Sequence, residues 1–303
     1  MKRVRILCLG AGEGWHSNQL ATAANRLECD LRFACYESLR SDVQSDRTCL
    51  YSDAGRIEDF DAILTRTMPA GTLEQVTFRL AILHAVDRPG GLPVINRPRA
   101  LEIAIDKFAT LNLVAQLGHP VPDTIVTQDR AQAMEAFKTL GGDCIVKPIF
   151  GGEGRGVMRV CDPELAWTTF STLENLGAVC YVQRFVAPGG CDTRLLVIGE
   201  EVYGIRRRNE GDFRTNVSSG ARSESIEVEP EQATMAKSIC NAIGLRFASV
   251  DLLDTEDGPP RVLEVNAIPG WKGAQGVADR SIAEEILSLV CHDVAAANGV
   301  NCS

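Results

Sequence analysis

The sequence lacks any run approaching the roughly 18 consecutive apolar residues that a membrane-spanning helix needs. It also lacks an excess of basic residues, because 31 Lys and Arg stand against 40 Asp and Glu, a formal net charge of −9. Nucleic acids and anionic membranes both attract basic surfaces, so we expect neither as a partner. The apolar run after Met1-Lys2-Arg3 is too short for a signal peptide and indicates a first β-strand. We therefore expect a cytoplasmic protein.

No two of the 11 cysteines are spaced as Cys-x-x-Cys. Their odd number argues against a disulfide framework, and their spacing does not support a zinc site. We expect most of them to be small buried hydrophobic residues in a reducing compartment.

The length and the apolar content favour two folded domains, since 303 residues with 45% hydrophobic residues can bury a large core. Strand and helix patterns alternate over the first 95 residues, which is typical of a parallel sheet covered by helices. The remainder has the clusters of strands and helices typical of α+β subdomains. We place the domains at 1–97 and 98–303, the second with lobes at about 118–184 and 185–303.

The expected strands are 4–9, 31–35, 61–66, 93–96, 124–127, 144–148, 157–161, 178–185, 194–198, 201–206, 247–253 and 261–266. The expected helices are 17–26, 73–86, 101–118, 130–140, 163–176, 230–243 and 281–297.

A first glycine cluster, Gly10-Ala11-Gly12-Glu13-Gly14, follows the first strand directly. It nearly matches the dinucleotide-binding fingerprint, but the third glycine comes one place early. No acidic residue stands convincingly at the end of the second strand. The alternative is a tight turn between a strand and a helix.

A second glycine cluster follows a strand that carries Lys147 near its end. Gly151-Gly152-Glu153-Gly154-Arg155-Gly156 is typical of a hairpin whose backbone N–H groups can approach phosphate oxygens, since glycine has no Cβ in the way. Lys147 would add a positive charge beside those oxygens. The cluster is not a Walker loop, because no Gly-Lys-Ser/Thr follows. The alternative is an ordinary hairpin.

Oxygen-bearing side chains recur on two later strands. Glu264 and Asn266 share one face of their strand because side chains alternate, and Asp251 stands within an apolar run upstream. Oxygen ligands of this kind suit Mg²⁺, which usually also binds water and substrate phosphates. The alternative is a pair of solvated strand ends.

Arginines gather in the same half of the chain despite its negative net charge. Such a cluster can bind phosphates or a carboxylate in bidentate fashion. We interpret Arg207 and Arg208 as a solvated charge run, whereas Arg206 and Arg214 are candidates for the site. The full cluster is Arg194, Arg206, Arg207, Arg208, Arg214 and Arg222.

The joint order of these motifs resembles the ATP-grasp superfamily, and within it the RimK-type α-L-glutamate ligases. The resemblance runs from about Ile95 to Gly276. It rests on Asp106-Lys107-Phe108, Ile145-Val146-Lys147-Pro148, Gly154-Arg155-Gly156-Val157, Gly190-Cys191-Asp192-Thr193-Arg194, Glu210-Gly211-Asp212-Phe213-Arg214-Thr215-Asn216, Val250-Asp251-Leu252-Leu253 and Leu263-Glu264-Val265-Asn266-Ala267-Ile268-Pro269-Gly270. It implies a Rossmann-like N-terminal domain followed by an ATP-grasp fold of two α+β subdomains.

The resemblance also implies roles for the matching residues. The residues implied to bind ATP are Lys107, Lys147, Gly152, Gly154, Gly156, Gln183, Arg184, Phe185, Asp192, Arg214, Thr215 and Asn216, with the backbone of Gln183–Phe185 as the hinge that reads adenine. Asp251, Glu264 and Asn266 would hold two Mg²⁺ (or Mn²⁺) ions. Lys147, Arg206 and Arg214 would be catalytic, with Arg206 facing the transferring phosphoryl group.

Two departures from the family pattern stand out. Family members usually have Glu after the hinge Gln, where this chain has Arg184, which leaves a ribose or base contact in doubt. Some other ATP-grasp ligases have Arg two residues before the metal-binding Asp, where this chain has Ser249. We therefore favour Arg206 for charge stabilisation.

Three short patches are similar to the branch that adds glutamate to tetrahydromethanopterin: Gly14-Trp15-His16, Thr65-Arg66-Thr67-Met68-Pro69 and Pro269-Gly270-Trp271. They make His16 and Arg66 candidate substrate contacts, although Trp15 and Trp271 could simply pack a domain interface. The implied function is an ADP-forming ligase that activates an acceptor carboxylate as an acyl phosphate and joins it to an amino acid, most naturally L-glutamate. The family also implies a homodimer or homotetramer.

The acceptor remains open at this point, between a pterin and alternatives such as a ribosomal-protein C-terminus or another small acceptor. Two more distant alternatives are a nicotinamide-dependent oxidoreductase built on the Gly10 cluster and a non-catalytic ATP-binding protein.

Overall fold

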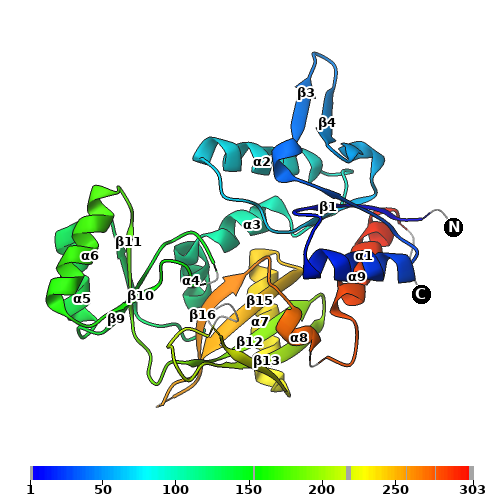
Figure 1. Cartoon of the computed structure of the whole chain (residues 1–303). Coiled ribbons are helices and arrows are strands. Elements are labelled where there is room, and N and C mark those ends of the chain that lie inside the picture. The colour runs from blue at the N-terminus through cyan, green and yellow to red at the C-terminus, as the bar shows by residue number, and fades with distance from the viewer. Residues whose placement is uncertain (1–2, 153, 216–219, 257, 277, 300–303) are drawn as a thin grey trace.

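The computed structural model describes residues 3–152, 154–215, 220–256, 258–276 and 278–299. Its strands form three main sheets and one small antiparallel sheet (Figure 1). Within these ranges no helix has both the length and the apolar character needed to cross a membrane.

The N-terminal sheet is parallel, as the alternating pattern predicts. Its strands lie in the order β2 (Asp30–Ala34), β1 (Arg5–Leu9), β6 (Ala62–Thr65) and β7 (Val94–Ile95), accompanied by the helices α1 (Trp15–Arg26) and α2 (Leu73–Val86). The chain leaves β1 to one side for β2 and later returns to the other side for β6. The carboxyl ends of β1 and β6 therefore form a topological switch point, the place where open α/β sheets bind ligands.

A small antiparallel sheet was not predicted. It consists of β3 (Arg40–Val43), β4 (Thr48–Ser52) and β5 (Gly55–Arg56), with the 3₁₀ turns η1 (Tyr36–Ser38) and η2 (Ile57–Asp59) on either side. Figure 1 shows the β3–β4 hairpin projecting from the parallel sheet. Its strands are short and largely solvent-accessible, so they lack the apolar alternation by which a strand is recognised.

The second sheet is antiparallel and forms a separate lobe with two helices (Figure 1). Its strand order is β10 (Met158–Val160), β9 (Cys144–Lys147), β11 (Cys180–Arg184) and β8 (Thr124–Thr127), and its helices are α5 (Arg130–Thr139) and α6 (Pro163–Asn175). Val146 and Val182 pack with Phe137 and Phe170 of the helices. Because side chains alternate, Lys147 and Gln183 lie on the face away from those helices.

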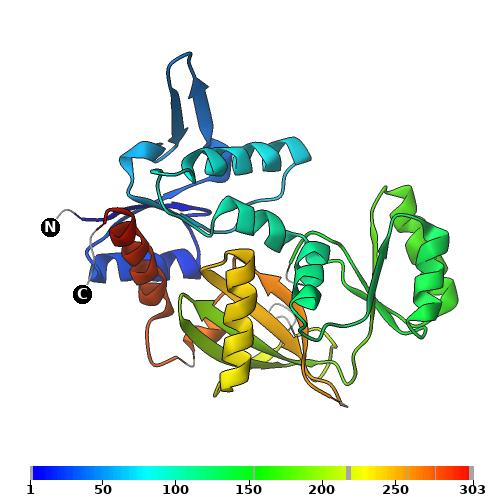
Figure 2. The same ribbon diagram turned by 180° about the vertical axis from the view of Figure 1, so that it is seen from behind.

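The third sheet has five antiparallel strands and supports most of the predicted site. The order is β14 (Arg222–Ile226), β13 (Glu201–Arg208), β12 (Cys191–Ile198), β15 (Phe247–Leu253) and β16 (Arg261–Asn266). Figure 2 shows α7 (Pro230–Ile243) lying across one face of the sheet. On the other face, Leu196 and Phe247 pack with α8 (Lys272–Gln275) and α9 (Ile282–Ala297). Of these elements, β14 and α8 were not predicted.

The prediction of one continuous helix over 101–118 is wrong. The segment forms two helices, α3 (Pro98–Ile105) and α4 (Lys107–Gln116). Asp106 has an extended backbone between them, and its carboxylate accepts hydrogen bonds from the amides of Phe108 and Ala109. A short acidic side chain in this position caps a new helix rather than continuing the old one. The break makes Lys107 the first residue of α4.

Asn96 joins the parallel sheet to the five-stranded sheet. Its amide nitrogen donates to the carbonyls of Phe247 and Ala267 at 2.6 and 2.8 Å, and its Oδ1 accepts from the amides of Arg246 and Phe247. The side chain is 1% exposed, so these bonds satisfy a polar group that would otherwise be costly to bury. The end of β7 is thereby fixed against the starts of β15 and of the loop after β16.

The cysteines are less buried than predicted. Of the ten in the described residues, Cys8, Cys144, Cys180 and Cys240 are buried, whereas Cys35 and Cys161 are exposed. The remaining four, Cys29, Cys49, Cys191 and Cys291, are half-buried. Burial as a small hydrophobic residue therefore holds for a minority of the described cysteines.

Candidate active site

One half of a face of the five-stranded sheet carries six polar residues, which we call the charged face. Strand pairing places them together: Asp192 stands opposite Arg207, Arg194 opposite Asp251, and Asp251 opposite Glu264. Asn266 lies two residues beyond Glu264 and therefore on the same side. The charged face thus consists of Asp192, Arg194, Arg207, Asp251, Glu264 and Asn266.

Two arginines neutralise the central acid of this face. Arg194 donates to both oxygens of Asp251 at 2.8 and 2.7 Å, and Arg207 donates to Asp251 Oδ2 at 2.8 Å. Burial alone would raise the pKa of Asp251, but Arg194 and Arg207 outweigh it and hold the pKa well below its usual range. Asp251, which is 1% exposed, is therefore ionised at neutral pH.

The interpretation of Arg207 as a solvated charge is wrong. Its side chain is buried and donates to Asp192 as well as to Asp251. The sequence contains the signal that identifies it, since the short turn Gly199–Glu200 between β12 and β13 fixes the register and sets Arg207 opposite Asp192. Arg208 is exposed and pairs with Glu224, as expected for a solvated charge.

Arg206 does not lie on the charged face. It neighbours Arg207 on β13, so its side chain projects to the other side of the sheet, where it pairs with Thr193 and Asp254. The alternation of the strand therefore places Arg206 on the opposite side of the sheet from Asp192, Asp251 and Glu264, and its predicted role towards the phosphoryl group stays a prediction. Arg194 and Arg207 are the arginines that the structure brings to the carboxylates.

Two lysines approach Glu264 from other elements. Lys147 on β9 is 6% exposed and donates to Gln183 Oε1 at 3.1 Å. Burial lowers the pKa of Lys147 to about 8, with Lys107 lowering it and Glu264 raising it. Burial likewise lowers the pKa of Lys107, and Glu264 opposes this shift. Among the described residues no ion pair or hydrogen bond occupies the Glu264 carboxylate. This region therefore holds two lysines beside one acid that has no ion-pair partner in the described part of the chain.

The glycine cluster forms the predicted hairpin between the antiparallel strands β9 and β10. Gly156 has φ of 72°, and a Cβ there would lie 2.9 Å from Pro148 Cγ, so both its backbone conformation and its surroundings require glycine. Gly154 also has positive φ, and a Cβ on Gly152 would meet no other atom within 4 Å. Lys107 Nζ donates to the carbonyl of Gly151 at 2.5 Å, which ties α4 to this hairpin.

The hinge residues already make several hydrogen bonds. The Gln183 side chain bridges Lys147 and Thr124. The amides of Arg184 and Phe185 donate to the carbonyls of Asp123 and Asp143, so neither amide is a free donor. The Arg184 side chain pairs with Asp123. The guanidinium carbon of Arg159 lies 3.5 Å from the centre of the Phe185 ring, and the Phe213 ring packs against the same ring edge to face. Adenine would have to use other backbone groups of this hinge.

One residue of the loop after β13 contacts the charged face. Thr215 is buried and donates to Asp192 Oδ2 at 2.5 Å. Arg214 pairs with Asp212 in its own loop, and among the described residues no hydrogen bond or ion pair joins its side chain to the lysines or to the charged face. Asn216 lies outside the described residues.

The charged face fits a divalent metal by the type of its donor atoms. Asp251, Glu264 and Asn266 offer carboxylate and amide oxygens, the ligands preferred by hard cations. Among the described ranges no three His, Cys, Asp or Glu side chains by themselves form a metal-binding group. The Asn266 amide would therefore be needed, together with substrate oxygens.

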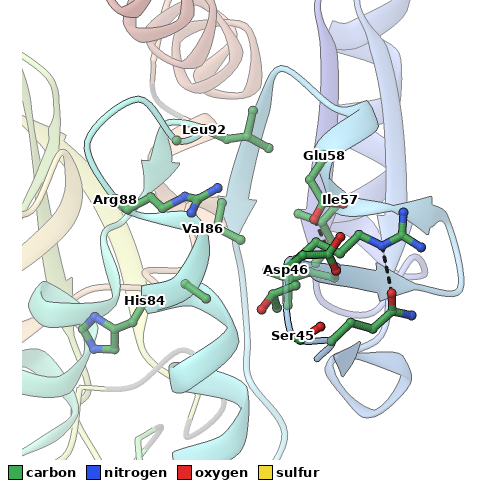
Figure 3. Close-up of a pocket in the computed structure, with 14 residues that line it drawn as sticks. Ser45, Asp46, Ile57, Glu58, His84, Val86, Arg88 and Leu92 are labelled. Atoms are coloured by element: carbon green, nitrogen blue, oxygen red, sulfur yellow. Dashed lines mark hydrogen bonds between the residues drawn. The ribbon is translucent and has the colours of Figure 1, made fainter. Parts of the chain in front are cut away.

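A pocket of about 710 Å³ lies elsewhere, between the β3–β4 hairpin and the end of α2 (Figure 3). Its lining includes Asp46, Glu58, His84 and Arg88. None of the predicted site residues contributes to it. The candidate site is therefore defined by its side chains rather than by this cavity.

Solved structures share the fold over nearly the whole chain. The ATP-grasp ligase PsnB complexed with a minimal precursor, Mg and ADP has a TM-score of 0.75 at 22% identity and covers 97% of this chain and 99% of its own. The RimK domain ATP-grasp protein of Sphaerobacter thermophilus has a TM-score of 0.71 at 23% identity, covering 94% and 99%. The fold is thus that of the ATP-grasp ligases, a class that binds ATP and divalent metals.

The sequence comparisons give the family. The model of the RimK-like ATP-grasp domain matches residues 104–290. The tetrahydromethanopterin:alpha-L-glutamate ligase of Methanosarcina acetivorans is 30% identical, covering 96% of this chain and 99% of that protein. A probable alpha-L-glutamate ligase of Sodalis glossinidius is 30% identical over 85% of each chain. The protein belongs to the RimK-like ATP-grasp family and is an ADP-forming acid–amino-acid ligase.

Proposed function

We propose that this protein uses ATP to join the amine of L-glutamate to a carboxylate of a tetrahydromethanopterin-type pterin. The observation that carries the proposal is the 30% identity, over 96% of the chain, to a ligase named for that acceptor. The buried Lys147 and the nearby Glu264 support the ATP-dependent step, because they combine a phosphate-binding cation with a metal-binding acid.

The reaction proceeds in two steps. An oxygen of the acceptor carboxylate attacks the γ-phosphorus of ATP. The bond between the γ-phosphorus and the oxygen bridging it to the β-phosphate breaks, and the products are ADP and an acyl phosphate of the acceptor. The neutral amine of glutamate then attacks the carbonyl carbon and gives up a proton, and the tetrahedral intermediate expels phosphate as the amide forms. The protein mainly aligns the reactants and neutralises charge.

Four groups of residues divide this work. Lys107 and Lys147 bind the phosphates, and the hairpin with Gly152, Gly154 and Gly156 covers them and excludes water, which would hydrolyse the acyl phosphate. Asp192 and Thr215 border the nucleotide. Asp251, Glu264 and Asn266 would hold two Mg²⁺ (or Mn²⁺) ions. Such ions neutralise phosphate oxygens during phosphoryl transfer.

Arg194 and Arg207, unlike Arg206, lie on the charged face. Each donates to Asp251, so they fix the orientation of that carboxylate on the charged face. We assign them positioning roles. Arg214, which pairs with Asp212, reaches the phosphates only if that pair opens when ATP binds.

The proposal is tested by ADP release with ATP and Mg²⁺, with and without L-glutamate, across a panel of acceptors. The panel contains a tetrahydromethanopterin precursor that lacks the added glutamate and a peptide with a free C-terminus. We expect glutamate-dependent ADP release with the pterin and a product heavier by one glutamate residue. Release only with the peptide would replace the pterin by a polypeptide acceptor. Absence of ATP binding would overturn the proposal.

A further inference from the structure

Three buried polar groups beside the charged face lack hydrogen-bond partners among the described residues. They are Arg66 Nη1, Trp271 Nε1 and Ser249 Oγ. Trp271 and Ser249 are each 0% exposed. Buried polar groups in folded proteins are nearly always paired, so three unpaired groups in one region require an explanation. The proposed ATP-binding residues do not explain why these three groups are unpaired.

Ser249 lies on the face of the five-stranded sheet that carries the charged face, and Arg66 and Trp271 pack beside Phe247 of the same face. Phe247, Ser249 and Asp251 alternate along β15 and therefore share a side of the sheet. The Phe247 ring is 5.9 Å from the Trp271 ring. The guanidinium carbon of Arg66 lies 4.7 Å from the Trp271 ring and 5.3 Å from the Phe247 ring. Ser249 thus stands between this aromatic group and the acid of the charged face.

A small cavity of about 30 Å³ lies under α8 and is lined by Arg194, Arg207 and Gly270, among others. Gly270 immediately precedes Trp271. The cavity therefore lies between the arginines of the charged face and Gly270, whereas Arg66, Ser249 and Trp271 do not line it.

The position of Arg66 is that of a ligand-binding residue in an open α/β sheet. It follows β6 directly, next to the turn after β1, at the topological switch point. A Cβ on Gly10 would lie 2.9 Å from Arg66 Cβ, so Gly10 leaves the space that Arg66 occupies. On the other side, α1 lies next to α8 (Figure 1), where the amide of Trp271 donates to His16 Nε2 at 3.2 Å.

Arg66 has no counter-ion in the described part of the chain. Its Nη2 donates to the carbonyl of Pro269 at 3.0 Å, and no carboxylate lies within 4.0 Å. Burial lowers the pKa of Arg66 to about 10. Burial, Arg66 and Lys272 lower the pKa of His16 to about 4, so this neighbour is neutral at pH 7. Arg66 is half-buried, and holding a cation there without a described carboxylate partner is costly, a cost that a bound anion would offset.

We propose that Arg66, Trp271 and Ser249 form a subsite that binds a carboxylate of one of the two substrates other than ATP. Arg66 Nη1 and Trp271 Nε1 are donors only, so the ligand has to be a hydrogen-bond acceptor, and the charge of Arg66 selects an anion. The subsite rests on the proposed function in that glutamate and the acceptor are the substrates that carry carboxylates.

The test is isothermal titration of wild type and variants, saturated with the nonhydrolysable analogue AMPPNP and Mg²⁺. The probes are L-glutamate, its two mono-amides (glutamine and isoglutamine), and the pterin precursor. We expect Arg66→Gln to weaken binding of either L-glutamate or the pterin about 10- to 100-fold, the range for hydrogen bonds to a charged group. Its affinity for AMPPNP should stay within about twofold of wild type. The probe whose affinity falls in Arg66→Gln identifies the substrate. If that probe is L-glutamate, the mono-amide that no longer binds to the wild type identifies which of its two carboxylates occupies the subsite.

Two further variants guard against a folding defect. Trp271→Phe keeps the ring and removes the N–H, and Ser249→Ala removes the hydroxyl; each should weaken the same probe about 3- to 10-fold. Arg40→Gln is the matched control, because Arg40 also lies over an aromatic ring, that of Tyr51, but is exposed. It should change nothing.

The possible outcomes separate the subsite from the proposed function. Unchanged affinity for both carboxylate probes in Arg66→Gln and Trp271→Phe would overturn the subsite, even with full ligase activity in the wild type. Failure of the wild type to bind either probe would overturn it as well. Arg66-dependent binding of L-glutamate without turnover on any acceptor would support the subsite and refute the proposed acceptors.

Discussion

Arg207 Nη2 donates to Asp251 Oδ2 at 2.8 Å, with both side chains almost completely buried. The same guanidinium bonds Asp192, so one arginine neutralises two acids that would otherwise repel each other on adjoining strands. Removing one member of such a group leaves the others charged and without compensation. The integrity of the charged face therefore depends on Arg207.

Replacing Arg207 by Met should lower the free energy of unfolding by about 3–5 kcal/mol, because Asp192 would lose its guanidinium partner and Asp251 would lose one of two. The matched control is Arg208→Met, next along the strand but exposed, which should cost less than about 0.5 kcal/mol. Urea denaturation of both variants measures the difference. Equal losses would show that Arg207 is not the centre of this network.

Glu264→Gln should reduce ADP release about 100-fold or more while leaving the unfolding midpoint nearly unchanged. Glu264 is an acid of the charged face with no described ion-pair partner, so its loss removes a proposed metal ligand without breaking a salt bridge. The control is Glu224→Gln, which removes an exposed acid on the neighbouring β14. Retention of normal ADP release in Glu264→Gln would contradict the metal assignment.

The affinity for ATP should fall as the pH rises through about 8. Lys147 has a lowered pKa of about 8 in the free protein and loses its charge above that value, whereas bound phosphates would favour the charged form. Between pH 7 and 9 the Kd should increase about tenfold. Calorimetry across this range measures the effect. Lys147→Arg, which stays charged, should show a flat profile, and a flat profile in the wild type would refute the role of Lys147.

The stability contributed by His16 should be lost as the pH falls from about 6.5 to 4. Its pKa is lowered to about 4 in the folded protein, mainly by burial, so the unfolded chain binds the proton first. Protonation would also remove the lone pair that accepts from the Trp271 amide. Compared with His16→Gln, the wild type should lose about 2 kcal/mol over this interval. Parallel pH dependence in both proteins would contradict this.

Local patterns predicted most of the architecture. The strands Thr124–Thr127, Phe247–Leu253 and Arg261–Asn266 and the helices Leu73–Val86 and Pro230–Ile243 have the bounds that were expected, because apolar spacing and clear end signals coincide there. The same patterns missed the exposed β3–β4 hairpin and the break at Asp106, where a capping side chain competes with helix continuation.

The chemistry of the site was only partly contained in the residue types. The sequence by itself predicts which side chains are candidates to bind phosphate or metal, namely Lys107, Lys147, Asp251, Glu264 and Asn266, because those functions depend on charge and donor atoms. Strand register decided that Arg207, and not Arg206, joins them, since adjacent residues face opposite sides of a sheet.

The packing of the parallel sheet against β15 and α8 decided the rest. It set the half-buried Arg66 against Trp271 with no counter-ion in the described part of the chain, an arrangement that joins residues about 200 positions apart and that no local pattern encodes. Propensity and spacing act over a few residues, whereas burial and pairing depend on which segments meet in space. The sequence therefore determined the available chemistry, and the tertiary structure decided which groups were left unpaired and able to bind a ligand.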